Sequence, residues 1–409
     1  MCVLTPPTRT GFQAVNDFQG GNHEKSKQKK AGRDRARLGA RWRPTSRGAL
    51  AGPTISLTFT DPDTGQIDSL GIESNCKLLN TKAAGYNRAL NSIARKPALM
   101  TINLSGLLLP VITPFTAGED IDADGLAANL EKWNGTGVIG YVVLGSTGER
   151  VNLDEREYLQ VIDTARQAVP QTLSFIAGAG QQSTHGTIKE IARAAQAGAE
   201  AVLVITPHYY RSAMTQETLV RHYMTVADAS PVPVILYSMP DLTGIKIEPE
   251  TAARLSEHPN IIGIKDSSAD LAELAETVRL VRRGFAVLIG NGTVLCEALQ
   301  AGAGGAILAV GCVVPQLCLE IYEAVRENDI ERAVALQERL TPLARAVTKT
   351  YGIGGLKAAM EMAGFVGGAV RSPLERPSEE ASVEIESLLR KAIDACSEVA
   401  FTKASEPRP

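Results

Sequence analysis

The sequence predicts an α/β protein built on a closed (β/α)8 TIM barrel with a C-terminal helical extension. Short apolar runs rich in β-branched residues alternate with amphipathic helical patterns from about residue 107 onward. Eight such runs follow one another over roughly 200 residues, which is the number of units that closes a parallel barrel. An open doubly wound sheet is disfavoured because no dinucleotide-binding glycine fingerprint follows the first run.

The expected strands are residues 108–112, 139–144, 173–177, 201–205, 234–237, 261–265, 286–289 and 305–308. Helical patterns lie between them, for example at 153–169, 187–197 and 215–229. Further helical patterns at 315–327, 330–347, 355–362 and 383–400 exceed what barrel closure requires. We therefore expect a barrel core over residues 105–313, and a last barrel helix with a C-terminal helical layer over residues 314–400. The active site of such a barrel lies at the C-terminal ends of its strands.

The N-terminal part of the chain differs from the rest in charge. Residues 1–100 contain 16 Lys and Arg against 7 Asp and Glu, whereas the remaining residues contain 26 against 38. The basic stretch from Lys25 to Arg47 would suit a transit peptide or nucleic-acid binding, but acidic residues interrupt it and no nucleic-acid module is recognisable. We expect residues 1–104 to be a basic extension that is disordered or results from a mis-called start, with Met100 as the alternative first residue.

The composition favours a cytoplasmic protein with no membrane or nucleic-acid partner. The sequence contains no apolar run long enough to span a bilayer and no signal-peptide pattern at its start. The cysteines lack the spacing of a metal site and the density of a disulfide scaffold, so we expect reduced and mostly buried thiols. They are Cys2, Cys76, Cys296, Cys312, Cys318 and Cys396.

Lys265 is the first candidate catalytic residue, because it ends the apolar run 261–265. Burial disfavours the charged form of an amine, so a buried lysine is available as a nucleophile that attacks a ketone and forms a Schiff base. Taken alone, the segment is also compatible with a lysine that simply reaches solvent at the end of a strand.

Two further strand ends carry suitable groups. After the second strand, Gly145 precedes Ser146 and Thr147, whose hydroxyls and backbone N–H groups could hold a carboxylate, although a capped glycine turn is the simpler explanation. Tyr237 ends the fifth strand, where its phenol could transfer protons or merely complete the core. At the rim of one barrel, these groups and Lys265 are what Schiff-base chemistry on a 2-oxo acid needs.

With GSTGE at 145, TPHYYR at 206, YSMPDLTG at 237 and GIKDSS at 263, the chain resembles a family of class I pyruvate-type aldolases. This is the dihydrodipicolinate synthase and N-acetylneuraminate lyase family, and the resemblance covers residues 106–373. It implies that Lys265 forms the imine, that Tyr237 relays protons, and that Ser146 and Thr147 hold the pyruvate carboxylate. We place Thr147 in the catalytic set as well. The imine provides the electrophilic activation, so no cofactor and no metal are expected.

The resemblance also implies an assembly. Tyr209 matches a tyrosine that, in several family members, crosses a subunit interface to assist the proton relay. The helical layer after the barrel helps to form tetramers from tight dimers in this family. We therefore expect a homo-oligomer, either a dimer or a tetramer, with a small-molecule 2-oxo acid as the other partner.

The choice of substrate rests on few residues. The resembled synthases place an arginine five residues after the catalytic tyrosine to bind the distal carboxylate of the aldehyde, and this chain has Leu242 there. Several stretches and Ser267 match 4-hydroxy-2-oxoglutarate aldolases, although that subgroup has asparagine in place of Thr147. We rank cleavage of a 4-hydroxy-2-oxo acid first, most simply 4-hydroxy-2-oxoglutarate to pyruvate and glyoxylate. A lyase or dehydratase of N-acetylneuraminate or of 2-keto-3-deoxy sugar acids comes second, and dihydrodipicolinate synthase third.

Other sites and functions have less support. The glycine-rich segments 290–292 and 302–305 would suit a phosphate group, but no lysine or arginine accompanies them. The histidines of the predicted barrel lack metal-ligand spacing, so we expect them on the surface or in loops; they are His185, His208, His222 and His258. A barrel that binds a 2-oxo acid without converting it is the alternative from another class. It is disfavoured because a protein that only binds has no physical reason to keep a buried amine and a proton relay.

Overall fold

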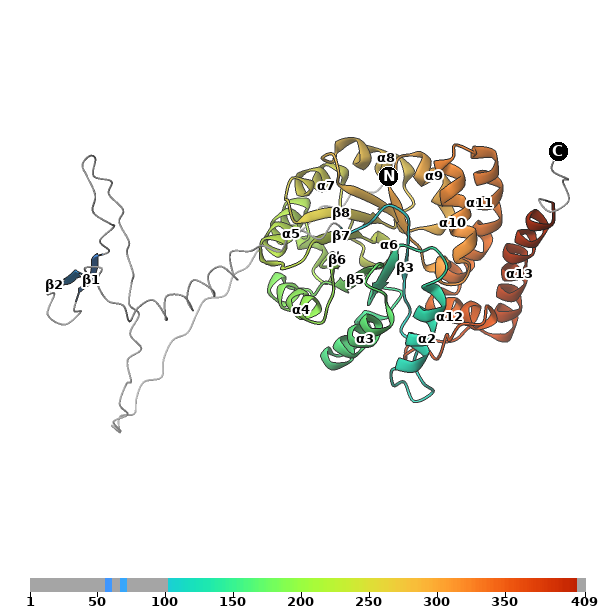
Figure 1. Ribbon diagram of the computed structural model, residues 1–409, viewed down its shortest axis with the longest axis horizontal. Coiled ribbons are helices and arrows are strands. Elements are labelled where there is room, and N and C mark those ends of the chain that lie inside the picture. The colour runs from blue at the N-terminus through green and yellow to red at the C-terminus, as the bar shows by residue number, and fades with distance from the viewer. Residues whose placement is uncertain (1–55, 61–66, 72–101, 403–409) are drawn as a thin grey trace, which may run out of the picture. The chain divides into compact units, whose positions relative to one another are not determined.

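The computed structural model describes residues 56–60, 67–71 and 102–402 (Figure 1). The chain divides into two compact units, Met1–Ala89 and Leu90–Pro409. In the first unit, β1 (Ser56–Thr60) and β2 (Ile67–Gly71) pair as an antiparallel two-stranded sheet. The sequence prediction did not include these strands. The expected disorder or mis-called start concerns residues that otherwise lie outside the described ranges, so it stays a prediction.

The second unit contains the closed barrel that the sequence predicted. Its parallel strands pair in chain order, and the last strand pairs with the first. They are β3 (Leu107–Pro110), β4 (Gly140–Val143), β5 (Ser174–Ala179), β6 (Ala201–Ile205), β7 (Val234–Ser238), β8 (Ile261–Asp266), β9 (Ala286–Ile289) and β10 (Gly305–Ile307). The bounds of β6 and β9 are those predicted, and the other strands begin and end within one or two residues of the prediction.

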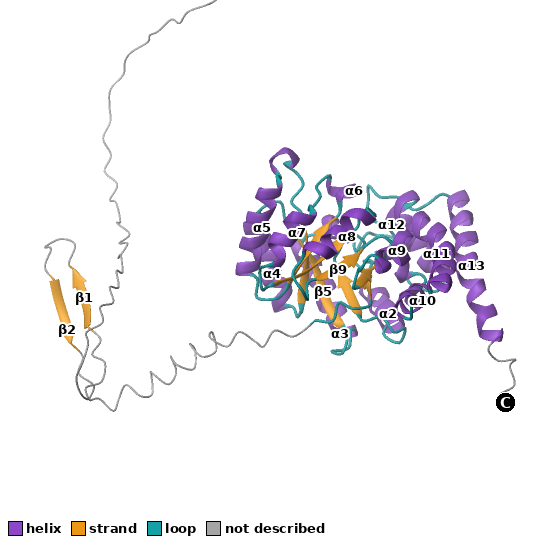
Figure 2. Cartoon of the chain, turned by 90° about the horizontal axis from the view of Figure 1, so that it is seen from above, coloured by secondary structure: helices purple, strands orange, loops and turns teal. Residues whose placement is uncertain are grey.

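Helices surround the strands in both views (Figures 1 and 2). Those that follow the barrel strands are α2 (Ala123–Trp133), α3 (Glu155–Ala168), α4 (Thr184–Gln196), α5 (Gln216–Ala229), α6 (Pro240–Thr243), α7 (Pro249–Ser256), α8 (Leu271–Leu280) and α9 (Leu295–Gln300). Local sequence explains where they begin. Asp154, for example, accepts a hydrogen bond from the Glu157 N–H at 2.8 Å, and the Glu157 carboxylate accepts from the Asp154 N–H at 2.9 Å. This capping box begins α3.

The barrel interior is a cluster of apolar side chains drawn from the strands. Side chains alternate between the two faces of a strand, so one set points into the barrel and the other packs under the helices. The inner cluster contains Leu104, Leu108, Val142, Ile176, Ala201, Leu203, Ile235, Tyr237, Leu288 and Ile307. Tyr237 therefore belongs to the barrel interior, at the C-terminal end of β7.

The remaining helices form the predicted C-terminal layer. These are α10 (Pro315–Arg326), α11 (Ile330–Arg345), α12 (Gly352–Met362) and α13 (Glu379–Thr402). In Figures 1 and 2, α11, α12 and α13 lie together on one side of the barrel, and α13 packs against both of the others. The described cysteines Cys296, Cys312 and Cys318 are buried free thiols, as expected, while the side chains of the other three lie outside the described residues.

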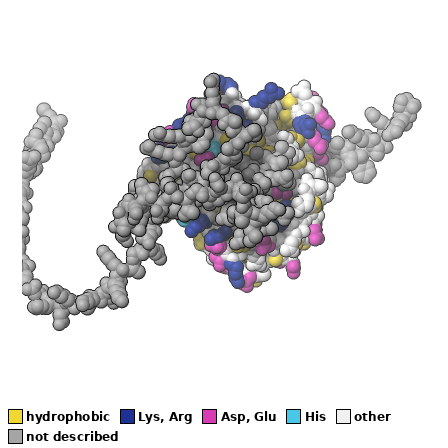
Figure 3. All heavy atoms as spheres, turned by 60° about the vertical axis from the view of Figure 1, so that its left-hand side comes forward, with side chains coloured by type: hydrophobic (Ala, Val, Ile, Leu, Met, Phe, Trp, Pro, Cys, Tyr) yellow, Lys and Arg dark blue, Asp and Glu magenta, His cyan; other side chains and the backbone are white. Residues whose placement is uncertain are grey.

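The surface of the described part carries both signs of charge. In the space-filling view of Figure 3, basic and acidic side chains occur in small separate groups on the coloured part of the face. In residues 56–60, 67–71 and 102–402, no helix combines the length and apolarity that crossing a bilayer requires.

Candidate active site

Lys265 and Tyr237 lie at the C-terminal ends of neighbouring strands. They are partners in the register of β7 and β8, so their side chains leave the sheet on the same face. Each residue is 5% exposed. Lys265 Nζ lies 4.5 Å from the centre of the Tyr237 ring. Lys265 is therefore buried at the barrel rim instead of reaching solvent, and its amine meets the phenol ring.

Among the lysines that the structure describes, Lys265 and Lys357 are both buried, but only Lys357 has a counter-ion. Lys357 is 1% exposed and its Nζ lies 2.5 Å from the Glu149 carboxylate. Lys265 makes no ion pair with any residue that the structure describes. A buried amine without an ionic partner is unusual, because an unpaired charge is costly to bury. This difference identifies Lys265, and not Lys357, as the candidate nucleophile.

Ser267 and Gly290 shape the space beside the Lys265 side chain. Ser267 is 6% exposed, and its hydroxyl has no hydrogen-bond partner among the described residues. A methyl group on Gly290 would lie 2.0 Å from Ser267 Oγ and 2.6 Å from Lys265 Cε. The serine hydroxyl and the lysine side chain therefore converge next to Gly290, and the hydroxyl has unused hydrogen-bonding capacity there. Sequence reasoning considered Gly290 only for phosphate binding and missed this role.

The turn after β4 brings Ser146 and Thr147 to the same rim. In the closed barrel, β4 lies opposite β8, so the turn and Lys265 face each other across the barrel mouth. Gly145 and Thr147 are buried, and Ser146 is partly exposed. Leu144 (φ 59°) and Glu149 (φ 53°), one at each end of the turn, have left-handed backbone conformations that are uncommon for residues other than glycine. The turn is therefore a constrained segment that needs support from its surroundings.

That support includes a contact that the sequence analysis did not predict. The Glu149 carboxylate accepts a hydrogen bond from Lys357 Nζ in α12, and both side chains are 1% exposed. Burial lowers the pKa of Lys357, and the Glu149 carboxylate opposes that effect. The only local signal was a lysine among small and apolar residues in the segment Gly-Gly-Leu-Lys-Ala-Ala-Met.

Tyr209 has an exposed side chain, in contrast to the buried Lys265. It is 76% exposed, and its ring meets the edge of Tyr210 at 5.1 Å between centroids. Leu242 in α6 is 60% exposed. Tyr209 follows β6 and Leu242 follows β7, so both lie toward the rim of the barrel that carries Lys265. A residue that reaches into a neighbouring subunit must be exposed in the single chain, as Tyr209 is. The role of Tyr209 in the proton relay stays a prediction.

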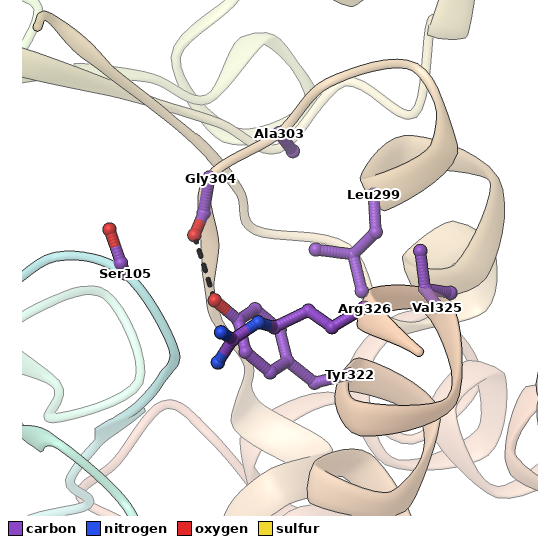
Figure 4. A pocket seen from close by; sticks show the side chains of 7 residues that line it. All are labelled: Ser105, Leu299, Ala303, Gly304, Tyr322, Val325 and Arg326. Carbon is purple, nitrogen blue, oxygen red and sulfur yellow. Dashed lines mark hydrogen bonds between the residues drawn. The ribbon is translucent and has the colours of Figure 1, made fainter. Parts of the chain in front are cut away.

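Figure 4 shows a separate cavity of about 350 Å³. Some of the residues that line it come just before β3 and β10 in the chain, and the others belong to α9 and α10. Among them, the Tyr322 hydroxyl donates a hydrogen bond to the Gly304 carbonyl at 3.2 Å. The lining residues are Ser105, Leu299, Ala303, Gly304, Tyr322, Val325 and Arg326. Because the residues just before β3 and β10 line it, this cavity lies at the N-terminal ends of the strands and is not part of the Lys265 site. The glycine-rich segment 302–305 lies at this face as well.

His222 corrects one expectation. It was expected on the surface or in a loop, but it lies in α5 and is 6% exposed, because it shares the inward face of that helix with Leu219. Its Nδ1 lies 2.9 Å from Thr184 Oγ1. Burial lowers the pKa of the His222 imidazole to about 4. Among the side chains in the described ranges, no group of three or more His, Cys, Asp or Glu could hold a metal ion.

Residues 103–392 match the dihydrodipicolinate synthetase family. The chain is 34% identical over 290 residues to a 4-hydroxy-tetrahydrodipicolinate synthase of Methanothrix thermoacetophila, which covers 71% of this chain and 97% of that protein. It is 36% identical over 285 residues to the Gluconobacter oxydans enzyme of the same name, covering 70% and 95%.

Solved structures of related proteins have the same fold. One is an E. coli prophage protein of the dihydrodipicolinic acid synthase family in complex with pyruvate, with a TM-score of 0.67 and 30% identity, covering 70% of this chain and 98% of that one. Another is a monomeric dihydrodipicolinate synthase variant, with a TM-score of 0.67 and 30% identity, covering 70% and 96%.

Proposed function

The chain belongs to the dihydrodipicolinate synthetase family, and on this premise we propose that Lys265 forms an imine with a pyruvate-type 2-oxo acid. Family members are Schiff-base lyases and aldolases, and the chain is a class I aldolase. The observation that carries the assignment of the nucleophile is the burial of Lys265 without a counter-ion, against the ring of Tyr237. In this proposal, Ser146 and Thr147 hold the substrate carboxylate, with Gly145 leaving room for it, and Ser267 offers its free hydroxyl.

The chemistry proceeds in balanced steps. The Lys265 amine attacks C2 of pyruvate, water leaves, and a protonated imine forms. Tyr237 accepts a proton from C3, which gives an enamine, and C3 of the enamine attacks the aldehyde carbon and forms a carbon–carbon bond. Tyr237 gives a proton to the resulting alkoxide, and hydrolysis releases the product from Lys265. Cleavage of a 4-hydroxy-2-oxo acid is the same sequence in reverse, beginning with removal of the C4 hydroxyl proton by Tyr237.

For the second substrate, the comparisons favour an order different from the one that the sequence predicted. The named relatives are 4-hydroxy-tetrahydrodipicolinate synthases, so condensation of pyruvate with aspartate semialdehyde has more support than cleavage of 4-hydroxy-2-oxoglutarate. A cation near α6 fits this order. Arg211 Nε would lie 3.2 Å from a methyl group on Gly244, at the end of α6. We propose that Arg211 binds the distal carboxylate of aspartate semialdehyde. In the resembled synthases, this carboxylate is bound by the arginine five residues after the catalytic tyrosine.

Cleavage of a 4-hydroxy-2-oxo acid is the second candidate, because an exposed Leu242 occupies the position of that arginine. A homo-oligomer is part of the proposal, supported by the exposed rings of Tyr209 and Tyr210 at the catalytic rim. The barrel core over residues 105–313 and the helical layer over 314–400 would form one catalytic unit. Light scattering would measure the assembly.

Borohydride reduction with pyruvate tests the nucleophile. Peptide mass spectrometry should find the reduced adduct on Lys265, and Lys357 serves as the internal control because it is also buried but is paired with a carboxylate. No adduct, or an adduct on another lysine, would contradict the mechanism.

A substrate panel tests the second substrate. Condensation of pyruvate with aspartate semialdehyde would be measured beside pyruvate release from 4-hydroxy-2-oxoglutarate, N-acetylneuraminate and 2-keto-3-deoxy sugar acids. The proposal expects condensation to be the fastest reaction. Arg211→Met should weaken use of aspartate semialdehyde and leave pyruvate trapping unchanged.

A further inference from the structure

A buried ion pair joins the turn after β4 to the C-terminal helical layer. Glu149 ends the turn in a left-handed conformation with φ 53°, and Lys357 lies in α12. Glu149 Oε1 and Lys357 Nζ are 2.5 Å apart, and each side chain is 1% exposed. This contact links two segments that are 208 residues apart in the chain.

Both charged groups have further partners that fix their orientation. The other carboxylate oxygen, Glu149 Oε2, accepts a hydrogen bond from the Arg371 backbone N–H at 3.2 Å. Lys357 Nζ also donates to the Ala369 carbonyl at 2.6 Å and lies 4.5 Å from the centre of the Phe115 ring. The Glu149 carboxylate is thus held at both oxygens by groups that follow the barrel in the chain.

The position of Glu149 is coupled to the two hydroxyls of the turn. Glu149 follows Thr147 by two residues, and its backbone N–H donates to the Ser146 carbonyl at 3.2 Å. A left-handed conformation at a glutamate costs of order 1 kcal/mol or more, and it persists only where contacts hold it. If the carboxylate lost its partners, relaxation of the backbone at Glu149 would displace Ser146 and Thr147.

We propose that Glu149 and Lys357 are positioning residues that hold the turn in the conformation in which Ser146 and Thr147 meet the carboxylate of the 2-oxo acid. The inference rests on the proposed function of this turn. Stability alone does not explain such a pair, because buried ion pairs replaced by apolar residues of similar volume often leave stability unchanged or raise it. Through this contact the C-terminal layer helps to position the turn that holds the substrate.

Lys357→Met removes the charge and keeps most of the side-chain volume. The test measures borohydride trapping of pyruvate on Lys265 across a range of pyruvate concentrations. We expect the half-saturating concentration to rise about tenfold or more, the scale of one lost hydrogen bond to a charged group. The yield at saturating pyruvate should stay that of the wild type, because Lys265 itself is untouched.

Arg166→Met is the matched control. Arg166 also pairs with a glutamate, Glu200, at 3.4 Å, and lies 4.6 Å from the centre of a phenylalanine ring, that of Phe175. This pair precedes β6 and lies at the opposite end of the barrel from the turn. Its loss should leave the half-saturating pyruvate concentration unchanged, so a rise specific to Lys357→Met would not reflect a general loss of ion pairing.

The double variant Glu149→Met/Lys357→Met separates positioning from stability. It should melt close to the wild type, because no buried charge is left unpaired, and still need about tenfold more pyruvate. It also decides the question if Lys357→Met does not fold. Wild-type half-saturation in a folded variant, or failure of both variants to fold, would show that the pair only supports the fold. No adduct in the wild type would instead refute the proposed function.

Discussion

Gly290→Ala should disable the enzyme by moving Lys265. The new methyl group would lie 2.6 Å from Lys265 Cε, and relief to an ordinary contact of 3.4 Å requires a shift of about 0.8 Å. Ser267 Oγ, at 2.0 Å, can rotate away, but Lys265 is confined against Tyr237 and the Asp266 carbonyl is a further close contact at 3.1 Å. A misplacement of about 1 Å at a reacting group can cost about 10²-fold in rate.

We therefore expect imine trapping on Lys265 to slow about 10²-fold in Gly290→Ala. The assay is the rate of adduct formation with pyruvate and borohydride, read by mass spectrometry on folded protein. Gly304→Ala is the control, because a methyl group there meets no atom within 4 Å. A wild-type trapping rate in folded Gly290→Ala would refute the argument that Gly290 leaves room for the nucleophile.

Other substitutions test the relay, the second substrate and the pH response. Tyr237→Phe should keep imine trapping and lose about 10²-fold or more in turnover, so unchanged kcat would remove Tyr237 from the relay. Leu242→Arg should improve the affinity for aspartate semialdehyde by one to two decades, since a bidentate arginine–carboxylate contact contributes about 1.5–3 kcal/mol; unchanged KM would contradict this. Burial lowers the pKa of His222 from 6.5 to about 4, so protons favour the unfolded chain between these values. The free energy of unfolding should fall by up to roughly 3 kcal/mol more in the wild type than in His222→Gln between pH 7 and 4, and equal losses would refute it.

The barrel was predictable because its signal is local and repeated. Each strand is a short apolar run bounded by helical patterns, and the order of strands in a barrel follows the order in the chain. The bounds of β6 could be read directly, since Ala201–Ile205 is apolar throughout. The inward position of His222 was missed because a polar residue on an otherwise apolar helix face leaves no mark in the hydrophobic pattern alone.

The meeting of Lys265 and Tyr237 at the barrel rim was predictable for the same reason, because the two residues end consecutive strands. The contacts that hold the neighbouring turn in place could not be predicted from the sequence. Glu149 belongs to the recognised segment GSTGE, but its partner lies in α12, and no local pattern predicts a pairing across 208 residues. The space that Gly290 leaves for Lys265 likewise depends on how β8 and β9 lie side by side.

Lys265 and Lys357 show where sequence reasoning about chemistry ends. Each is a lysine within a stretch of small and apolar residues, and each is buried in the fold. Burial alone would nominate both as nucleophiles. Lys357 has a carboxylate at 2.5 Å and a carbonyl at 2.6 Å, which stabilise its charge, whereas Lys265 faces a phenol ring and an unpartnered hydroxyl. The chemical difference between the two amines is therefore set by their tertiary partners. A candidate nucleophile is recognised by the absence of a counter-ion as well as by burial.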